Sequence, residues 1–237
     1  MNRDTFDFGW KFFKGDAPGA EQTDFADASW RDQHLPHDWS IEGPFSKDAP
    51  AKGEGGYLPT GVGWYRKRFR IPEAYRDRRV SIEFDGVYQN SEVWINGHYL
   101  GKRPNGFISF HYDLTPYLDH GGENVIAVKV DNSYQPNCRW YTGSGIYRHT
   151  WLRATSKVHI ATWGTFVTMP QVDANSSIIQ IKTQVQNDSP NVTRCTLSTS
   201  ILDAEAEAVQ EIAAGGAYEF VQQMTVARPN LWSPENP

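Results

Sequence analysis

The chain has 237 residues and a formal net charge of −5, enough length for one large domain or two ordinary ones. Its hydrophobic content of 39% and its nine Trp suffice for packed cores. Its basic residues form no block, which argues against nucleic acid as a partner. No apolar run approaches the ~20 residues that cross a bilayer. The sequence therefore predicts a soluble protein without a membrane or nucleic-acid partner.

The start of the chain and its cysteines leave the compartment open. The stretch from Met1 to Phe13 lacks the basic start and the apolar run of a signal peptide. A mature exported protein written without its leader is compatible with this, so both periplasm and cytoplasm stay open. Cys138 and Cys195 fall in different predicted domains. No disulfide is therefore expected, and the redox compartment is undetermined.

Short strands separated by turns are predicted over the first part of the chain. Apolar and polar residues alternate over Ser81 to Phe84 and over Val125 to Val130, which predicts half-buried strands. Between them, Ser91 to Leu100 carries Asn96-Gly97 flanked by strand formers, a strong hairpin signal. Turn residues recur every ~8 to 12 positions, a spacing that favours a β-sandwich over a parallel sheet.

The densest group of chemically versatile residues lies in Asn137 to Leu152, with the sequence NCRWYTGSGIYRHTWL. Arg139 can donate two hydrogen bonds to hydroxyl groups, and Trp140 offers a flat apolar face. Gly143 and Gly145 permit backbone angles that a Cβ forbids. On these residues alone, a sugar-binding loop and an ordinary strand, turn and strand are equally good interpretations.

A second unit is predicted after residue 154. Five strand candidates follow one another there, richer in Thr, Gln and Ala and poorer in aromatic residues than the first unit. They are Thr165 to Val172, Ile178 to Asn187, Arg194 to Leu202, Ala206 to Ile212 and Tyr218 to Ala227. Such a composition is typical of a structural spacer.

Three segments upstream of Asn137 carry a family resemblance together with the segment that starts there. They are LPHDWSIEGPF (Leu35 to Phe45), GGYLPTGVGWYRKRF (Gly55 to Phe69) and the run from Phe84 to Leu118. In this order and at these separations they resemble the amino-terminal sugar-binding domain of glycoside hydrolase family 2, especially its bacterial β-galactosidases. NLWSPENP, at residues 230–237, resembles a phrase of the family's second domain.

The resemblance implies an all-β fold in two parts. Residues 1–154 are expected to form a jelly-roll, galactose-binding-like β-sandwich, and residues 155–237 a partial immunoglobulin-like β-sandwich. A seven-stranded immunoglobulin-like sandwich needs two strands more than the five predicted, so an unpaired sheet edge and an uncovered apolar face are expected. Either mobility of the second unit or pairing with another copy of the chain, and thus a homo-oligomer, would follow.

The resemblance also implies that the chemistry takes place outside this chain. Retaining glycosidases use two carboxylates about 5 to 5.5 Å apart, which in family 2 are glutamates of an eight-stranded barrel. No segment of this sequence matches those motifs, so no catalytic residue and no cofactor is assigned. Near the sodium ligand of some relatives this chain has Asn137 and Cys138, so no metal is assigned either.

The expected function is the non-catalytic part of a retaining β-galactosidase that supplies substrate contacts and supports the catalytic barrel. Its expected partners are a β-galactoside and that barrel. Glucuronidase and mannosidase activities stay open, because those family members share the domain. The alternative from another class is a free-standing carbohydrate-binding module or lectin.

By the resemblance, part of the sugar site comes from the first domain. Asp38 is the first candidate, as an acceptor for galactose hydroxyl groups that His37 and Trp39 place. Arg139, beside Trp140, is the second, as a donor to the same ring. The structural alternatives are that Asp38 caps a turn and that Arg139 forms an ion pair at the domain boundary. If one sugar uses both, their functional groups lie within ~10 Å of each other.

Overall fold

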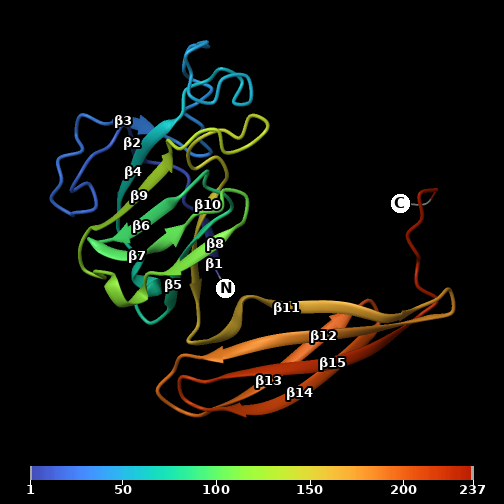
Figure 1. The fold of residues 1–237 in the computed structure, drawn as a ribbon. Helices are drawn as coiled ribbons and strands as arrows, with labels where there is room; N and C mark the ends of the chain where they lie inside the picture. Colours follow the sequence, from blue (N-terminus) through green and yellow to red (C-terminus); the bar gives the residue numbers. More distant parts are fainter. Residues whose placement is uncertain (1, 236–237) are drawn as a thin grey trace. The chain divides into compact units, whose positions relative to one another are not determined.

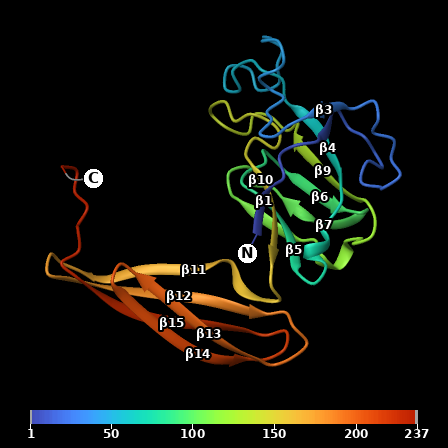
Figure 2. The same ribbon diagram turned by 180° about the vertical axis from the view of Figure 1, so that it is seen from behind.

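The computed structural model describes residues 2–235, and the chain divides into two compact units between Thr155 and Ser156. The described residues form strands and two short 3-10 turns, with no α-helix among them. Figures 1 and 2 show the ribbon from opposite sides. The predicted all-β fold class is confirmed.

The first unit is the predicted jelly-roll β-sandwich, built from a six-stranded and a four-stranded antiparallel sheet. The six-stranded sheet has the order β3 (Arg31–Gln33), β2 (Trp10–Lys14), β4 (Gly61–Phe69), β9 (Asn124–Asn132), β6 (Ser91–Ile95), β7 (His98–Arg103). The four-stranded sheet has the order β1 (Asn2–Thr5), β10 (Thr150–Thr155), β5 (Arg79–Phe84), β8 (Phe110–Asp113). The 3-10 turns are η1 (Glu73–Tyr75) and η2 (Thr115–Tyr117).

The inward-facing apolar side chains of the alternating strands fill the space between the two sheets. Val80, Ile82 and Phe84 of β5 point inward and are fully buried, and Phe84 stacks on Phe110 with ring centroids 5.0 Å apart. Burying each such side chain stabilises the fold by roughly 1.5–3 kcal/mol. The predicted hairpin is confirmed: β6 ends at Ile95 and β7 begins at His98. Both turn residues between them have positive φ, as a type I′ turn requires.

The outer face of the six-stranded sheet carries a second, smaller core. Trp64 stacks on Trp94 with centroids 5.4 Å apart, and Trp30 belongs to the same apolar cluster. The buried guanidinium of Arg66 holds the covering loop, because it bonds to Asp27 Oδ2 (2.8 Å) and to the Gln22 carbonyl oxygen (2.9 Å). Several of the Trp residues therefore fill core and contact no ligand.

The second unit contains all five predicted strands and is the predicted partial immunoglobulin-like sandwich. A three-stranded sheet has the order β11 (Val158–Val172), β12 (Ser176–Asn187), β15 (Ala217–Ala227), and a two-stranded sheet pairs β13 (Thr193–Ile201) with β14 (Ala204–Ile212). The buried Gln222 of β15 joins the sheets, since its Nε2 donates to the carbonyl oxygens of Leu197 (3.2 Å) and Ala206 (3.1 Å). Figures 1 and 2 both show β13 and β14 beside β15.

The predicted start of the first strand in this unit, at Thr165, is wrong. β11 already begins at Val158, but its register with β12 shifts between Ile160 and Thr165, and Trp163 has a φ of 54°. A bulge of this kind interrupts the period of two, so the alternation is hidden in the sequence. Pairing of this unit with another copy of the chain stays a prediction.

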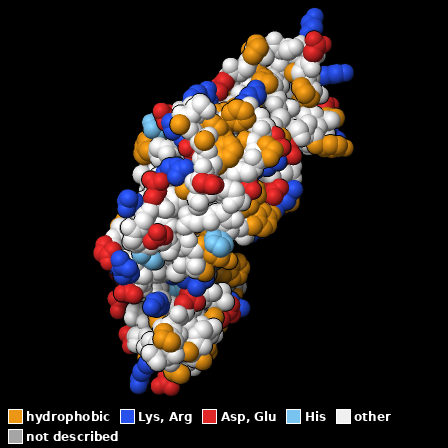
Figure 3. Space-filling view, turned by 90° about the vertical axis from the view of Figure 1, so that its left-hand side faces the viewer, with side chains coloured by type: hydrophobic (Ala, Val, Ile, Leu, Met, Phe, Trp, Pro, Cys, Tyr) orange, Lys and Arg blue, Asp and Glu red, His pale blue; other side chains and the backbone are white. Residues whose placement is uncertain are grey.

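Charged side chains of both signs are interspersed over the face of the molecule shown in Figure 3. No helix among the described residues has the length and apolar character needed to cross a bilayer.

Candidate functional site

Two segments about a hundred residues apart in the sequence meet in the first unit. One is the loop that follows β3, and the other is the connection from β9 to β10, whose residues 133–144 are called the arm below. Backbone hydrogen bonds join them: His37 N donates to the Ile146 carbonyl oxygen (2.8 Å) and Trp39 N to that of Ser144 (3.0 Å). The segments LPHDW and RWYTGSG are therefore brought side by side.

Asp38 lies where the two segments touch. Its Oδ1 accepts hydrogen bonds from the backbone N–H groups of Ser40 (2.9 Å) and Ser144 (2.8 Å), and Tyr141 Oη donates to its Oδ2. The turn-capping role that was the structural alternative is thus present. A carboxylate has about four lone-pair sites. These three bonds leave one acceptor position on Oδ2 for a ligand.

Tyr141 stays a donor to Asp38 over the whole physiological pH range. Burial, followed by the hydrogen bond to the Asp38 carboxylate, raises the pKa of the Tyr141 hydroxyl well above its usual value. A phenol that keeps its proton orients the carboxylate instead of repelling it. Tyr141 therefore belongs to the site, although no sequence pattern separated it from the other aromatic residues of its segment.

His37 lies behind Asp38, in the interior. It is buried, its Nδ1 lies 2.7 Å from Tyr65 Oη, and its Nε2 lies 3.0 Å from both Glu42 Oε1 and Arg31 Nη2. Burial lowers the pKa of the imidazole, with partial compensation from Glu42. Both ring nitrogens are occupied by protein groups, so His37 acts on the site by holding the backbone on which Asp38 sits.

Arg139 and Trp140 lie near the tip of the arm and face solvent. The Trp140 side chain is 66% exposed. Arg139 is exposed and makes no hydrogen bond or ion pair with any residue between 2 and 235, so the ion pair considered for it is not observed in that range. Tyr141 follows two residues later and bonds to Asp38. Arg139 is therefore tethered close to Asp38, and their separation of within ~10 Å stays a prediction.

Two glycines at the end of the arm, Gly143 and the following Gly145, allow the close approach of the two segments. A Cβ on Gly143, which has a φ of +76°, would lie 2.6 Å from Asp38 Oδ2. A Cβ on Gly145 would lie 2.3 Å from Tyr65 Oη. The expectation that these glycines adopt backbone angles closed to other residues is confirmed.

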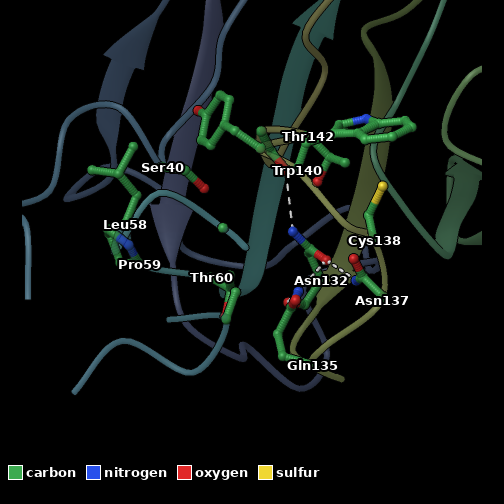
Figure 4. Close-up of a pocket in the computed structure, with 14 residues that line it drawn as sticks. Ser40, Leu58, Pro59, Thr60, Asn132, Gln135, Asn137, Cys138, Trp140 and Thr142 are labelled. Atoms are coloured by element: carbon green, nitrogen blue, oxygen red, sulfur yellow. Dashed lines mark hydrogen bonds between the residues drawn. The ribbon is translucent and has the colours of Figure 1, made fainter. Parts of the chain in front are cut away.

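A pocket opens between the loop and the arm, with polar groups on both sides. Figure 4 shows Leu58, Pro59 and Thr60 on one side, Cys138 and Trp140 on the other, and Asn132 between them. The remaining lining comes from Ser40, Ala51, Gly55, Gln135, Asn137, Tyr141, Thr142 and Gly143. Hydroxyl, amide and aromatic groups therefore line this pocket, but its enclosed space of about 10 Å³ is room for one water molecule and not for a sugar ring.

Comparison with known families identifies both units. The model for "Glycosyl hydrolases family 2, sugar binding domain" matches residues 21–156, and the model for "Glycosyl hydrolases family 2" matches residues 158–237. The chain belongs to glycoside hydrolase family 2. The predicted family is thus confirmed, and within it the chain corresponds to the amino-terminal, non-barrel part.

Individual relatives agree over nearly the whole chain. A β-galactosidase of Bacteroides ovatus, BoGH2A, is 48% identical over 99% of this chain, and a β-glucuronidase of Formosa agariphila is 32% identical over 97%. The crystal structure of a glycosyl hydrolase family 2 member from Bacteroides cellulosilyticus superposes with a TM-score of 0.92 at 38% identity and covers 100% of this chain. The chain spans 28%, 26% and 32% of these three proteins, respectively.

Proposed function

We propose that this chain is the substrate-contacting, non-catalytic part of a retaining β-galactosidase. The observation that carries the proposal is the 48% identity, over 99% of the chain, to a protein named as a β-galactosidase. The chain supplies contacts to a terminal β-galactoside and supports a catalytic barrel elsewhere in the parent protein. The two carboxylates of a retaining mechanism belong to that barrel.

Four residues have roles in this proposal. Asp38 accepts a hydrogen bond from a galactose hydroxyl at the remaining position on Oδ2, and Arg139 donates to the same ring. Trp140 covers an apolar face of the sugar or of the group attached to it, for which its 66% exposure leaves room. His37 places Asp38 from behind. The support for these roles is that Trp140 lines the pocket, that Asp38 is hydrogen-bonded to Tyr141 and Ser144 of the arm, and that Asp38, Arg139 and Trp140 keep unused binding capacity.

A β-glucuronidase is the second candidate. Relatives of that name match almost the whole chain, one of them at 32% identity. A glucuronide has a carboxylate at C6 where a galactoside has a hydroxymethyl group, and its C4 hydroxyl is equatorial where that of galactose is axial. The exposed guanidinium of Arg139 makes no ion pair with a described residue, and arginine binds carboxylates with two parallel hydrogen bonds. Recognition of the C6 carboxylate would therefore fall to Arg139.

Kinetics of the full-length protein that carries this chain test the proposal. The substrates are 4-nitrophenyl β-D-galactopyranoside and 4-nitrophenyl β-D-glucuronide. The galactoside is expected to have the higher kcat/KM, and Asp38→Asn and Arg139→Ala are each expected to raise its KM about tenfold, the effect of one lost charge-assisted hydrogen bond. Asp48→Asn, an exposed carboxylate of the same loop, and Arg194→Ala, an exposed arginine of β13, are the matched controls.

Three outcomes would contradict the proposal in different ways. A higher kcat/KM for the glucuronide would favour the second candidate. Unchanged KM values in both variants would remove the site assignment and leave the family assignment intact. If the 237-residue chain alone bound galactose in calorimetry as tightly as the full-length protein does, a free-standing binding module would be the better description.

A further inference from the structure

Asn132, the last residue of β9, joins the two ends of the arm. Its Nδ2 donates to the Gly143 carbonyl oxygen (3.1 Å) and to Ser144 Oγ (2.8 Å), where the arm ends. Its Oδ1 accepts from Gln135 Nε2 (2.9 Å) and Asn137 Nδ2 (2.7 Å), where the arm begins. Figure 4 shows this side chain at the centre of the pocket, with hydrogen bonds toward Gln135 and Asn137.

These four hydrogen bonds use the whole capacity of the side chain. A primary amide has two N–H donors and two oxygen lone pairs. All four are engaged by protein groups, and Asn132 is only 1% exposed. Asn132 therefore has nothing left with which to bind a sugar, although it lines the pocket.

The same residue connects the arm to Asp38. Ser144 Oγ, which accepts from Asn132, also accepts from Ser40 Oγ (2.8 Å). The backbone N–H groups of Ser144 and Ser40 both donate to Asp38 Oδ1. Ser40 and Ser144 are buried as completely as Asn132 is. The network is thus continuous from Asn132 to the Asp38 carboxylate, and a change at one end alters the geometry at the other.

We propose that Asn132 is a positioning residue for the sugar site: it holds the arm in the geometry in which Arg139 and Trp140 face the same place as Asp38. The inference rests on the proposed sugar contacts of those three residues. Fixing the backbone of a residue costs conformational entropy. An arm that is ordered before the substrate arrives spares the complex this cost, so Asn132 raises substrate affinity without touching substrate.

Asn132→Asp in the 237-residue chain is the direct test. It keeps the shape of the side chain and the Oδ1 lone pairs that accept from Gln135 and Asn137, and it removes the two N–H donors to Gly143 and Ser144. Amide hydrogen exchange of Trp39, Ser144 and Gly145, whose N–H groups are hydrogen-bonded where the arm ends, is expected to become at least about tenfold faster, since the two hydrogen bonds from Asn132 to Gly143 and Ser144 are lost. Exchange in β4 serves as the internal reference. Asn191→Asp is the matched control, because the Asn191 side chain is exposed and makes no hydrogen bond within residues 2–235.

Gln135→Ala covers the case in which a buried carboxylate at position 132 prevents folding. Gln135 is only partly buried, and its replacement removes one hydrogen bond to Asn132 Oδ1 and another to the Asn132 carbonyl oxygen. Faster exchange of the Trp39, Ser144 and Gly145 amides is expected here as well, by a factor of roughly three to ten. Unchanged exchange of these three amides in the variants that fold would overturn the inference.

Kinetics of the full-length protein then separate this inference from the proposed function. Asn132→Asp is expected to raise KM for 4-nitrophenyl β-D-galactopyranoside about tenfold with kcat within about twofold, the pattern of lost preorganisation. If Asp38→Asn raises KM and Asn132→Asp does not, the inference fails and the proposed function stands. If Asp38→Asn and Arg139→Ala leave KM unchanged while the Trp39, Ser144 and Gly145 amides exchange faster in Asn132→Asp, the proposed function fails and with it the role of Asn132 in binding sugar.

Discussion

The two units differ in how deeply the same kind of strand is buried. In the first unit, six-stranded and four-stranded sheets enclose a large apolar cluster that includes the fully buried Ile82 and Phe84. In the second unit, the buried cluster found among the described residues consists of Val185, Ile212 and Phe220. Alternation alone makes strands in both units. The depth of the core depends on how many strands the opposite sheet has to cover it.

The edge strands of the two units also differ, in whether charged residues protect them against pairing with another chain. In the first unit, the edge strands β3 and β7 carry Arg31, Asp32, Lys102 and Arg103, and charges on an edge discourage pairing with another chain. β11 of the second unit has one strand neighbour in its sheet, carries no Lys, Arg, Asp or Glu, and exposes Phe166 and Met169. Charges therefore protect these edges of the first unit against pairing, whereas β11 lacks such protection and its pairing with another copy of the chain stays a prediction.

The largest expected effect is the loss of packing in the first unit. Phe84→Ala is expected to lower the free energy of unfolding by about 4 kcal/mol, because Phe84 is fully buried and its removal leaves a cavity next to Phe110. Urea denaturation followed by Trp fluorescence measures it. Phe45→Ala, at a side chain that is 78% exposed, is the control and should change stability by less than about 0.5 kcal/mol.

The corresponding change in the second unit sharpens the comparison. Phe220 is 2% exposed, but its neighbours Leu197 and Ala208 are only partly buried. Phe220→Ala is therefore expected to cost about 2 kcal/mol, less than Phe84→Ala, because a thinly covered core collapses more easily around a deletion. Hydrogen exchange in β12 and β15 measures the effect locally. A loss equal to that of Phe84→Ala would show that both cores are equally well packed.

A smaller effect concerns a cation inside the first unit. Burial lowers the pKa of Lys67 to about 8, although its Nζ donates to the Phe6 carbonyl oxygen (2.9 Å) and lies 3.4 Å from the Phe6 ring centroid. Between pH 8 and the ordinary Lys pKa of 10.5 the unfolded chain binds more protons than the folded one, so stability rises with pH across this window. Below pH 8 the full penalty of the buried charge applies.

Lys67→Met removes that penalty. The Phe6 carbonyl oxygen keeps a partner, because Trp10 Nε1 also donates to it (2.8 Å). The variant is expected to gain on the order of 1 kcal/mol relative to the parent at pH 7, a value reduced for the exposed part of the side chain. Thermal unfolding at several pH values should show this gain shrinking from about pH 8 upward. A difference that is independent of pH would mean that Lys67 does not titrate in this range.

Local features of this protein follow from its sequence. The period of two in β5, the Asn96-Gly97 turn and all five strands of the second unit are readable from neighbouring residues, because pleating and turn geometry act over a few positions. The half-buried strand predicted over Val125 to Val130 is wrong, because Val125 to Val128 of β9 are buried on both faces, between the core of the sandwich and the outer cluster around Trp64. A second exception is the start of β11, where the bulge at Trp163 breaks the period. Family membership is readable for a similar reason, since it rests on contiguous motifs in a given order.

The arrangement of the site needed the tertiary structure. LPHDW and RWYTGSG mark its two halves in the sequence, but the hydrogen bond from Tyr141 to Asp38 joins residues 103 positions apart. Asn132 is indistinguishable in the sequence from any Asn at the end of a strand. Its four partners face it only after β9 is seated between β4 and β6 and the arm has folded back over its end. Sequence patterns encode which face a side chain takes, whereas sheet packing decides which distant groups that face meets.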